Sequence, residues 1–131
     1  MQKISVETAE HYTWGQRCDG WHLVKQPELS VIQERMPPGT SEVRHVHKTA
    51  RQFFFILRGA VVIEADGSEH ELGAGQGLEV APHVAHQVFN RSNADVEFLV
   101  VSQPPSHGDR EPAPAESGTS PRVTARPQTT G

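Results

Sequence analysis

Short apolar stretches recur along most of the chain, and hydrophobic and polar residues tend to alternate within them. A period of two is typical of β-strands with one buried face, and no stretch sustains the period of an amphipathic helix. Glycine, proline or aspartate separates the stretches, and Asp66-Gly67 is a typical hairpin turn. The pattern predicts an all-β antiparallel sandwich or barrel, with strands near residues 21–25, 29–36, 43–47, 51–57, 60–65, 69–72, 77–80, 84–89 and 96–102.

The two ends of the chain differ from this central part. Residues 1–20 mix polar residues with a few aromatic ones and predict an N-terminal arm or an irregular entry strand, before a barrel domain over residues 21–103. Residues 104–131 are rich in proline, serine, threonine and glycine and offer few apolar side chains to bury. We expect this C-terminal tail to be largely disordered, from about Glu111 onward, because it cannot recover the entropy lost on ordering.

Composition excludes several classes of function. The chain has 131 residues, a formal net charge of −4 and 35% hydrophobic residues, which is enough for one modest core. The acidic balance argues against a nucleic-acid partner, and no apolar run is long enough to cross a membrane. The N-terminus lacks the apolar segment of a signal peptide, and Cys18 is the single cysteine. We therefore expect a cytoplasmic protein without a disulfide framework.

Histidines are concentrated in the middle of the chain. His45 and His47 are two residues apart, so both imidazoles point to one face of a β-strand. Gln52 follows on the next apolar run and His86 on a third, so three strands can bring three imidazoles and one amide to one point. Such ligands are typical of Mn, Fe, Co, Ni, Cu or Zn. We predict one divalent transition metal per chain, bound by His45, His47, Gln52 and His86, with positions left open for water or substrate.

The amide at position 52 affects the charge of this predicted site. A glutamate there would cancel one positive charge of the ion, whereas Gln52 leaves the ion with its full charge. A more strongly charged ion favours an anionic ligand, such as a carboxylate, an enediolate or hydroxide. We therefore expect the partner of the site to be a small anionic molecule.

The spacing of these residues resembles the two motifs of the cupin superfamily. Gln52 stands where the first motif usually has glutamate, and His83 stands where the second usually has glycine. The matching positions are Gly39, His45, His47 and Gly59 in the first motif and Gly75, His86 and Asn90 in the second. The resemblance covers about residues 29–102. It implies a small single-domain cupin of type 2: a double-stranded β-helix, or jelly roll, commonly dimeric, with the metal inside the barrel.

The resemblance implies a range of activities rather than a single one. A His-His-Gln-His set is similar to that of small cupins that linearise unsaturated uronates. We predict an enzyme that acts on a small organic acid or sugar acid by metal-stabilised enolate chemistry of the isomerase or lyase type. The alternatives are an iron-dependent dioxygenase and a non-catalytic cupin that binds a small molecule. His83 is a candidate second-sphere base, with an exposed loop histidine as the alternative reading.

Alternation on the strand that carries Gln52 also predicts an oligomer. It places Gln52, Phe54 and Ile56 inward, and it places Phe53, Phe55 and Leu57 on the opposite face. The outer aromatic side chains need cover, either from the second sheet or from another subunit. We therefore predict a homodimer.

Overall fold

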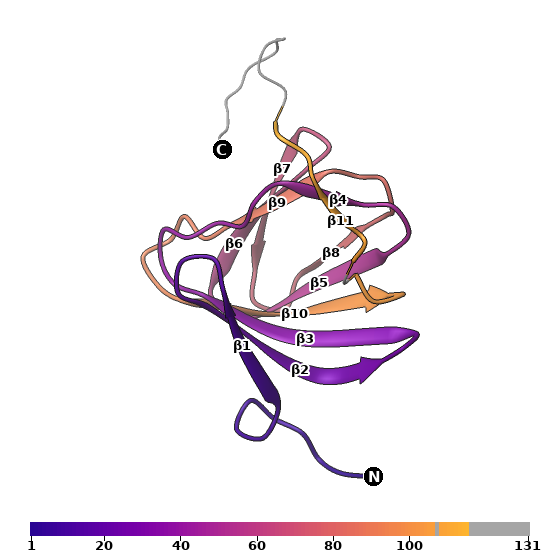
Figure 1. Ribbon diagram of the computed structural model, residues 1–131. Coiled ribbons are helices and arrows are strands. Elements are labelled where there is room, and N and C mark those ends of the chain that lie inside the picture. The colour runs from indigo at the N-terminus through magenta and orange to yellow at the C-terminus, as the bar shows by residue number, and fades with distance from the viewer. Residues whose placement is uncertain (107, 116–131) are drawn as a thin grey trace.

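The computed structural model describes residues 1–106 and 108–115, and within them the chain forms strands and turns without a helix (Figure 1). Accordingly, no helix in this described part is long and apolar enough to cross a membrane. The strands are β1 (Glu10–Trp14), β2 (Cys18–Gln26), β3 (Leu29–Met36), β4 (His45–His47), β5 (Arg51–Arg58), β6 (Ala60–Ala65), β7 (Ser68–Gly73), β8 (Gly77–Val80), β9 (His86–Phe89), β10 (Val96–Gln103) and β11 (Arg110–Pro112).

Two antiparallel sheets face each other in this fold. One has the strand order β1-β2-β3-β10-β5-β8, and the other has the order β11-β4-β9-β6-β7. Strands that are distant in sequence lie side by side, as β10 does between β3 and β5. This arrangement is the double-stranded β-helix, and it confirms the predicted all-β jelly roll.

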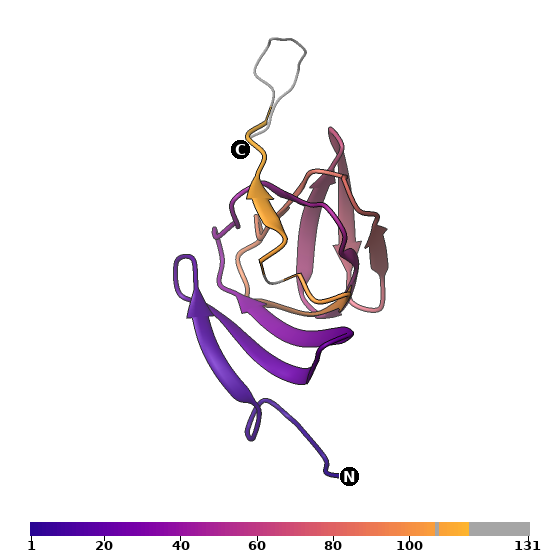
Figure 2. The same ribbon diagram turned by 45° about the vertical axis from the view of Figure 1, so that its right-hand side comes forward.

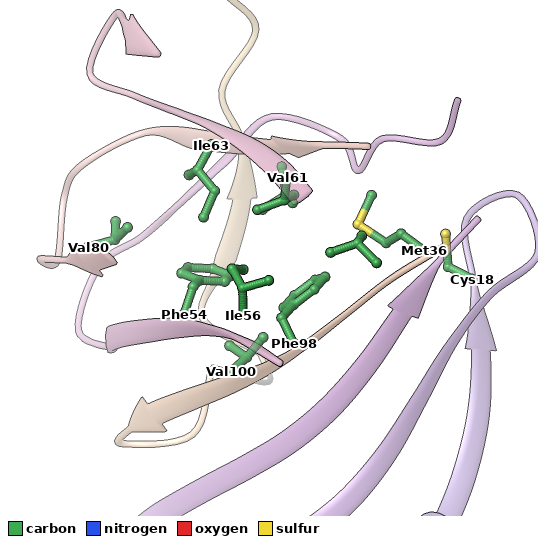
Figure 3. Close-up of a cluster of buried hydrophobic side chains, with 11 residues drawn as sticks. Cys18, Met36, Phe54, Ile56, Val61, Ile63, Val80, Phe98 and Val100 are labelled. Carbon is green, nitrogen blue, oxygen red and sulfur yellow. The ribbon is translucent and has the colours of Figure 1, made fainter. Parts of the chain in front are cut away.

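The hydrophobic core lies between the two sheets, where the inward side chains of both meet (Figure 3). On β5 the alternation is as predicted: Gln52, Phe54 and Ile56 are buried, while Phe53 and Leu57 are each 41% exposed. Phe98 of β10 packs in the same cluster and is 1% exposed. Burying one such side chain stabilises the fold by about 1.5–3 kcal/mol, so this cluster holds the two sheets together.

The turn between β5 and β6 requires a glycine. Gly59 has a φ of +88°, a conformation that side chains rarely adopt. A Cβ atom there would also lie 2.6 Å from the carbonyl oxygen of Asp95. The turn therefore lets the chain pass from one sheet to the other directly after the strand that carries Gln52.

The N-terminal residues are more regular than an arm. Residues 1–20 contain β1 and the first residues of β2, which pair in register from Glu10↔His22 to Trp14↔Cys18. Figure 2 shows these two strands at one edge of the larger sheet. Trp14 packs against the hydrophobic core, which gives this hairpin an apolar anchor.

The predicted onset of disorder at Glu111 is wrong for residues 111–115. Arg110–Pro112 forms β11, which pairs with β4 (Figure 1). Beyond it, the amide of Ala113 donates to the carbonyl of Arg44 at 2.9 Å, and the Arg44 guanidinium donates to the carbonyl of Ala113 at 2.9 Å. Main-chain pairing on a sheet edge needs no apolar side chain, so composition did not reveal it. The rest of the predicted tail, residues 116–131, lies outside the described residues.

Candidate metal centre

Three buried histidines meet on the inner face of the smaller sheet. His45 and His47 project from β4 to the same side, and His86 of β9 lies opposite His45 in register. These residues are 4%, 4% and 1% exposed, respectively. One nitrogen from each ring lies within 4.8 Å of the others. The strand pairing thus brings together the three imidazoles that the sequence pattern predicted, and such a group could hold a metal ion.

Main-chain carbonyls fix the orientation of two of these rings. His45 Nδ1 lies 2.8 Å from the carbonyl oxygen of Val43, and His86 Nδ1 lies 3.0 Å from that of Val84. A carbonyl accepts only, so each Nδ1 carries the proton and donates it. The Nε2 atoms are then left with free lone pairs, which is the arrangement that metal-binding histidines use.

His47 shows a need for a ligand most directly. Both of its ring nitrogens are buried and have no hydrogen-bond partner among the described residues. Leaving one buried polar atom unpaired costs about 1–3 kcal/mol. A cation bound at one nitrogen of His47 would remove part of this cost, so the unpaired imidazole fits a metal ligand better than a structural core histidine.

Gln52 completes the group from the larger sheet. Its side-chain oxygen lies 3.1 Å from His86 Nε2, and its side-chain nitrogen donates to Ser102 Oγ at 3.0 Å. Two atoms that offer only lone pairs therefore face each other, and a shared cation would stabilise them. For two ligands at right angles, metal–ligand distances of about 2.1 Å require a separation of about 3 Å. The amide oxygen thus stands where a fourth ligand would stand.

Burial keeps the three imidazoles uncharged at neutral pH. It lowers the pKa of His45 to about 3, with a further contribution from His86. It lowers the pKa of His86 to about 4 and also lowers that of His47. Neutral imidazole is the form that coordinates a metal. The residues present therefore fit a divalent transition ion in chemistry as well as in position.

Asp109 supports the site from outside. Its carboxylate accepts hydrogen bonds from the amides of Lys48, Thr49 and Ala50, at 3.1, 3.0 and 2.9 Å. These amide bonds, that from Ala50 first, lower the pKa of Asp109 to about 2. The loop that it holds connects His47 to the strand of Gln52. Asp109 therefore fixes the relative position of two predicted ligands.

His83 lies apart from this group. Its side chain is exposed, and its amide donates to the carbonyl of His47 at 2.7 Å. It has a φ of 72°, which explains why a glycine is usual at this position of the motif. The structure gives the imidazole no hydrogen bond within the described residues, so a second-sphere role for His83 stays a prediction.

Sequence reasoning missed Ser102 and Asp109. Ser102 follows Val96, Phe98 and Val100 on the inward face of β10 and is 2% exposed. A polar residue that continues an apolar alternation is a signal that could have identified it. Asp109 has no such signal, because its role depends on amides about sixty residues away in the chain.

Comparison with known proteins identifies the family of this fold. The sequence profile of the family described as "Cupin domain" matches residues 32–102. An uncharacterised protein of Methanocaldococcus jannaschii is 28% identical over 91 residues, which cover 69% of this chain and 73% of that protein. An oxalate-binding protein of Thermotoga maritima is 31% identical over 67 residues, covering 51% of this chain and 55% of that protein. The chain thus spans about half the length of the oxalate-binding relative.

A solved structure shows the same fold. A sugar phosphate isomerase of the cupin superfamily from Silicibacter pomeroyi superposes with a TM-score of 0.68 and 24% identity, covering 78% of this chain and 75% of the other. At this level of identity the likeness concerns the fold. The matched profile covers more than half of the sequence and includes His45, His47, Gln52 and His86. The chain belongs to the cupin domain family.

Proposed function

We propose that the protein is a metal-dependent enzyme that acts on a small organic acid or sugar acid by isomerisation or elimination next to a carbonyl group. The observation that carries the proposal is the meeting of three buried, uncharged imidazoles with the oxygen of Gln52. His47, whose ring nitrogens have no hydrogen-bond partner in the described part of the chain, supports a bound ion in particular. The ion would be Mn, Fe, Co, Ni, Cu or Zn, one per chain.

The chain's own residues would set the electrical properties of this site. His45, His47, His86 and Gln52 are all neutral ligands, so none of them reduces the charge of the ion. A divalent transition ion held there polarises carbonyl and carboxylate oxygens and stabilises negative charge that develops on them. The neutral ligand set therefore favours an acidic partner over a neutral one.

The test joins binding to turnover. The protein, purified without chelators, would be screened by thermal shift against small organic acids and sugar acids, and each stabilising acid would be incubated in D₂O. We expect one of them to exchange a carbon-bound proton or to change its NMR spectrum, and His47→Ala to abolish both effects. His70→Ala, a histidine of β7 outside the group, is the matched control. If no acid that binds is altered or exchanged, the enzymatic proposal fails.

A non-catalytic binding protein is the second candidate. The relative from Thermotoga maritima is named an oxalate-binding protein, and that name favours binding without turnover. This candidate predicts that an acid stabilises the protein and is recovered unchanged, with its proton unexchanged. The same screen therefore separates the two candidates. Oxygen uptake during incubation would indicate the dioxygenase alternative instead.

We also propose that two copies associate through the outer face of β5. Phe53 and Leu57 are each 41% exposed there, and the rings of Phe53 and Phe55 stack 6.2 Å apart. The arginines that border this face are already paired within the chain, Arg51 with Glu79 and Arg58 with Glu97. A second copy would thus meet an apolar, charge-satisfied surface. A monomer mass in light scattering at micromolar concentration would contradict this.

A further inference from the structure

Arg110 lies next to the metal-binding group because of the pairing of β11 with β4. Arg110 stands opposite His47 in register, and Pro112 stands opposite His45. Residues directly opposite each other in an antiparallel pair project to the same face of the sheet. The imidazoles of β4 point inward, so the Arg110 side chain projects to that side too. Arg110 is also exposed, which leaves it accessible to a solute.

The charge of Arg110 acts on five titratable groups of this interior. Burial is the main cause of the lowered pKa values of His45, His47 and His86, and the guanidinium adds to each. It also acts on the partly buried carboxyl groups of Glu34 and Glu42. Groups from three strands and a loop are thus within electrostatic reach of one cation.

Arg110 has few partners of its own. Within the described residues its guanidinium makes one hydrogen bond, from Nη2 to the carbonyl oxygen of Val43 at 3.4 Å. Among the described residues no carboxylate lies within ion-pair distance of it, although other arginines of the chain have such partners. A guanidinium offers five N–H donors in a fork that matches a carboxylate. Most of these donors are therefore left for a bound anion.

Two partly buried carboxyl groups form the other side of this interior. Glu34 lies on the inward face of β3, and Tyr12 of β1 donates to its Oε2 at 3.4 Å. The Tyr12 ring reaches it across Gly20, where a Cβ would lie 2.3 Å from the ring. Glu42 lies 4.0 Å from His45, and its Oε1 is buried without a hydrogen-bond partner in the described chain. Burial raises the pKa of Glu34 to about 7.

These groups together suit a ligand whose two ends differ chemically. A carboxylate at one end fits the guanidinium of Arg110. A second carboxylate at the other end would face the carboxyl oxygens of Glu34 and Glu42. A hydroxyl group suits them better, because it can both donate to a carboxyl oxygen and accept from it. An unpartnered oxygen of Glu42 and a Glu34 held by Tyr12 are available for that role.

We propose that Arg110 binds the carboxylate of the ligand and that Glu34 and Glu42 bind its hydroxyl groups, so that the site takes polyhydroxy monocarboxylates in preference to dicarboxylates. This inference rests on the proposed function, because it names the substrate class of the same site. It assigns specificity to β11, a strand that lies outside the residues matched by the family profile.

The test measures binding rather than activity. Calorimetric titration of the full chain, with the metal it retains on purification, would use gluconate and oxalate as probes. We expect gluconate to bind at least tenfold more tightly than oxalate. Arg110→Gln should weaken the binding of gluconate by about tenfold or more, since hydrogen bonds to charged groups contribute strongly. The affinity of Arg110→Lys for gluconate should lie between those of the wild type and Arg110→Gln, because lysine keeps the charge and loses the forked donors.

Arg51→Gln is the matched control, since it removes the same charge from the outer face and should change gluconate binding less than twofold. Glu34→Gln should narrow the preference for gluconate over oxalate. Unchanged gluconate binding by Arg110→Gln, at normal metal content, would overturn the inference and leave the proposed function intact. Oxalate binding as tight as gluconate would overturn it as well. A wild-type protein that takes up no metal and binds neither acid would contradict both proposals.

Discussion

Two groups of polar side chains share the interior of this barrel, and burial acts on them in opposite directions. The histidine group, defined as His45, His47 and His86, has lowered pKa values. The carboxyl pair, defined as Glu34 and Glu42, has pKa values raised to about 7 and about 8, and burial is the main cause of both shifts. Desolvation penalises whichever form is charged, so both groups tend toward neutrality near pH 7. The same interior thus offers lone pairs to a cation on one side and hydrogen-bonding carboxyl groups on the other.

The largest expected effect is the pH dependence that the histidine group gives to the metal-free protein. His45 has a pKa of about 3 when folded and about 6.5 when unfolded, so the unfolded chain takes up the proton first on acidification. The stabilisation is complete above pH 6.5 and is lost as the pH falls toward 3. The free energy of unfolding would be measured with urea on chelator-treated protein at pH 6.5 and pH 4. Between these two pH values, His45→Gln should lose about 3 kcal/mol less of it than the wild type. If the free energy of unfolding changed with pH identically in the wild type and in His45→Gln, the lowered pKa of His45 would be contradicted.

The carboxyl pair should change the pH dependence of stability with the opposite sign. Glu34 has a pKa of about 7 when folded and about 4.5 when unfolded, so the folded state holds the proton between these values. Its stabilisation is complete below pH 4.5 and is lost as the pH rises through 7. On acidification from pH 7 to 4.5, the free energy of unfolding of Glu34→Gln should therefore rise by about 2–3 kcal/mol less than that of the wild type. If both variants change the slope in the same sense, the contrast between the two groups is wrong.

The packing of Tyr12 over Gly20 gives a test on stability alone. A Cβ at position 20 would overlap the Tyr12 ring, with its nearest atom at 2.3 Å. Gly20→Ala should cost about 1–3 kcal/mol in the free energy of unfolding, as overpacking generally does. Combining it with Tyr12→Ala should restore part of that loss relative to the sum of the single changes. Strict additivity would show that the ring does not lie there.

The smallest of these effects concerns the support of the histidine group by Asp109. Asp109→Asn keeps the size of the side chain but weakens its hydrogen bonds to the amides of Lys48, Thr49 and Ala50. We expect the affinity for metal to fall about tenfold, as changes to groups that orient metal ligands commonly do. Asp66→Asn, in the β6–β7 turn, is the control. Equal metal affinities for the two variants would contradict a supporting role.

The two groups also differ in how far the sequence predicts them. The spacing of His45 and His47, and the position of Gln52 on the following strand, put the predicted ligands on inward faces by local periodicity alone. Sequence reasoning missed the carboxyl pair. A signal for Glu34 was available, because Ser30, Ile32, Glu34 and Met36 lie on one face of β3 and a charged residue on that face is unusual. The contributions of Tyr12 and Arg110 depend on which strands pair, through β1–β2 and β4–β11. Local periodicity contains no information on such pairings.

The central claim is that His45, His47, His86 and Gln52 hold one divalent transition metal ion. Equilibrium dialysis of the chelator-treated protein at neutral pH, against each of Mn, Fe, Co, Ni, Cu and Zn, tests it directly, with His47→Ala and His70→Ala measured in parallel. The account predicts about one ion per chain for the wild type and for His70→Ala, and close to none for His47→Ala. A wild-type protein that retains none of these ions, or a His47→Ala protein that retains one as firmly, would contradict it.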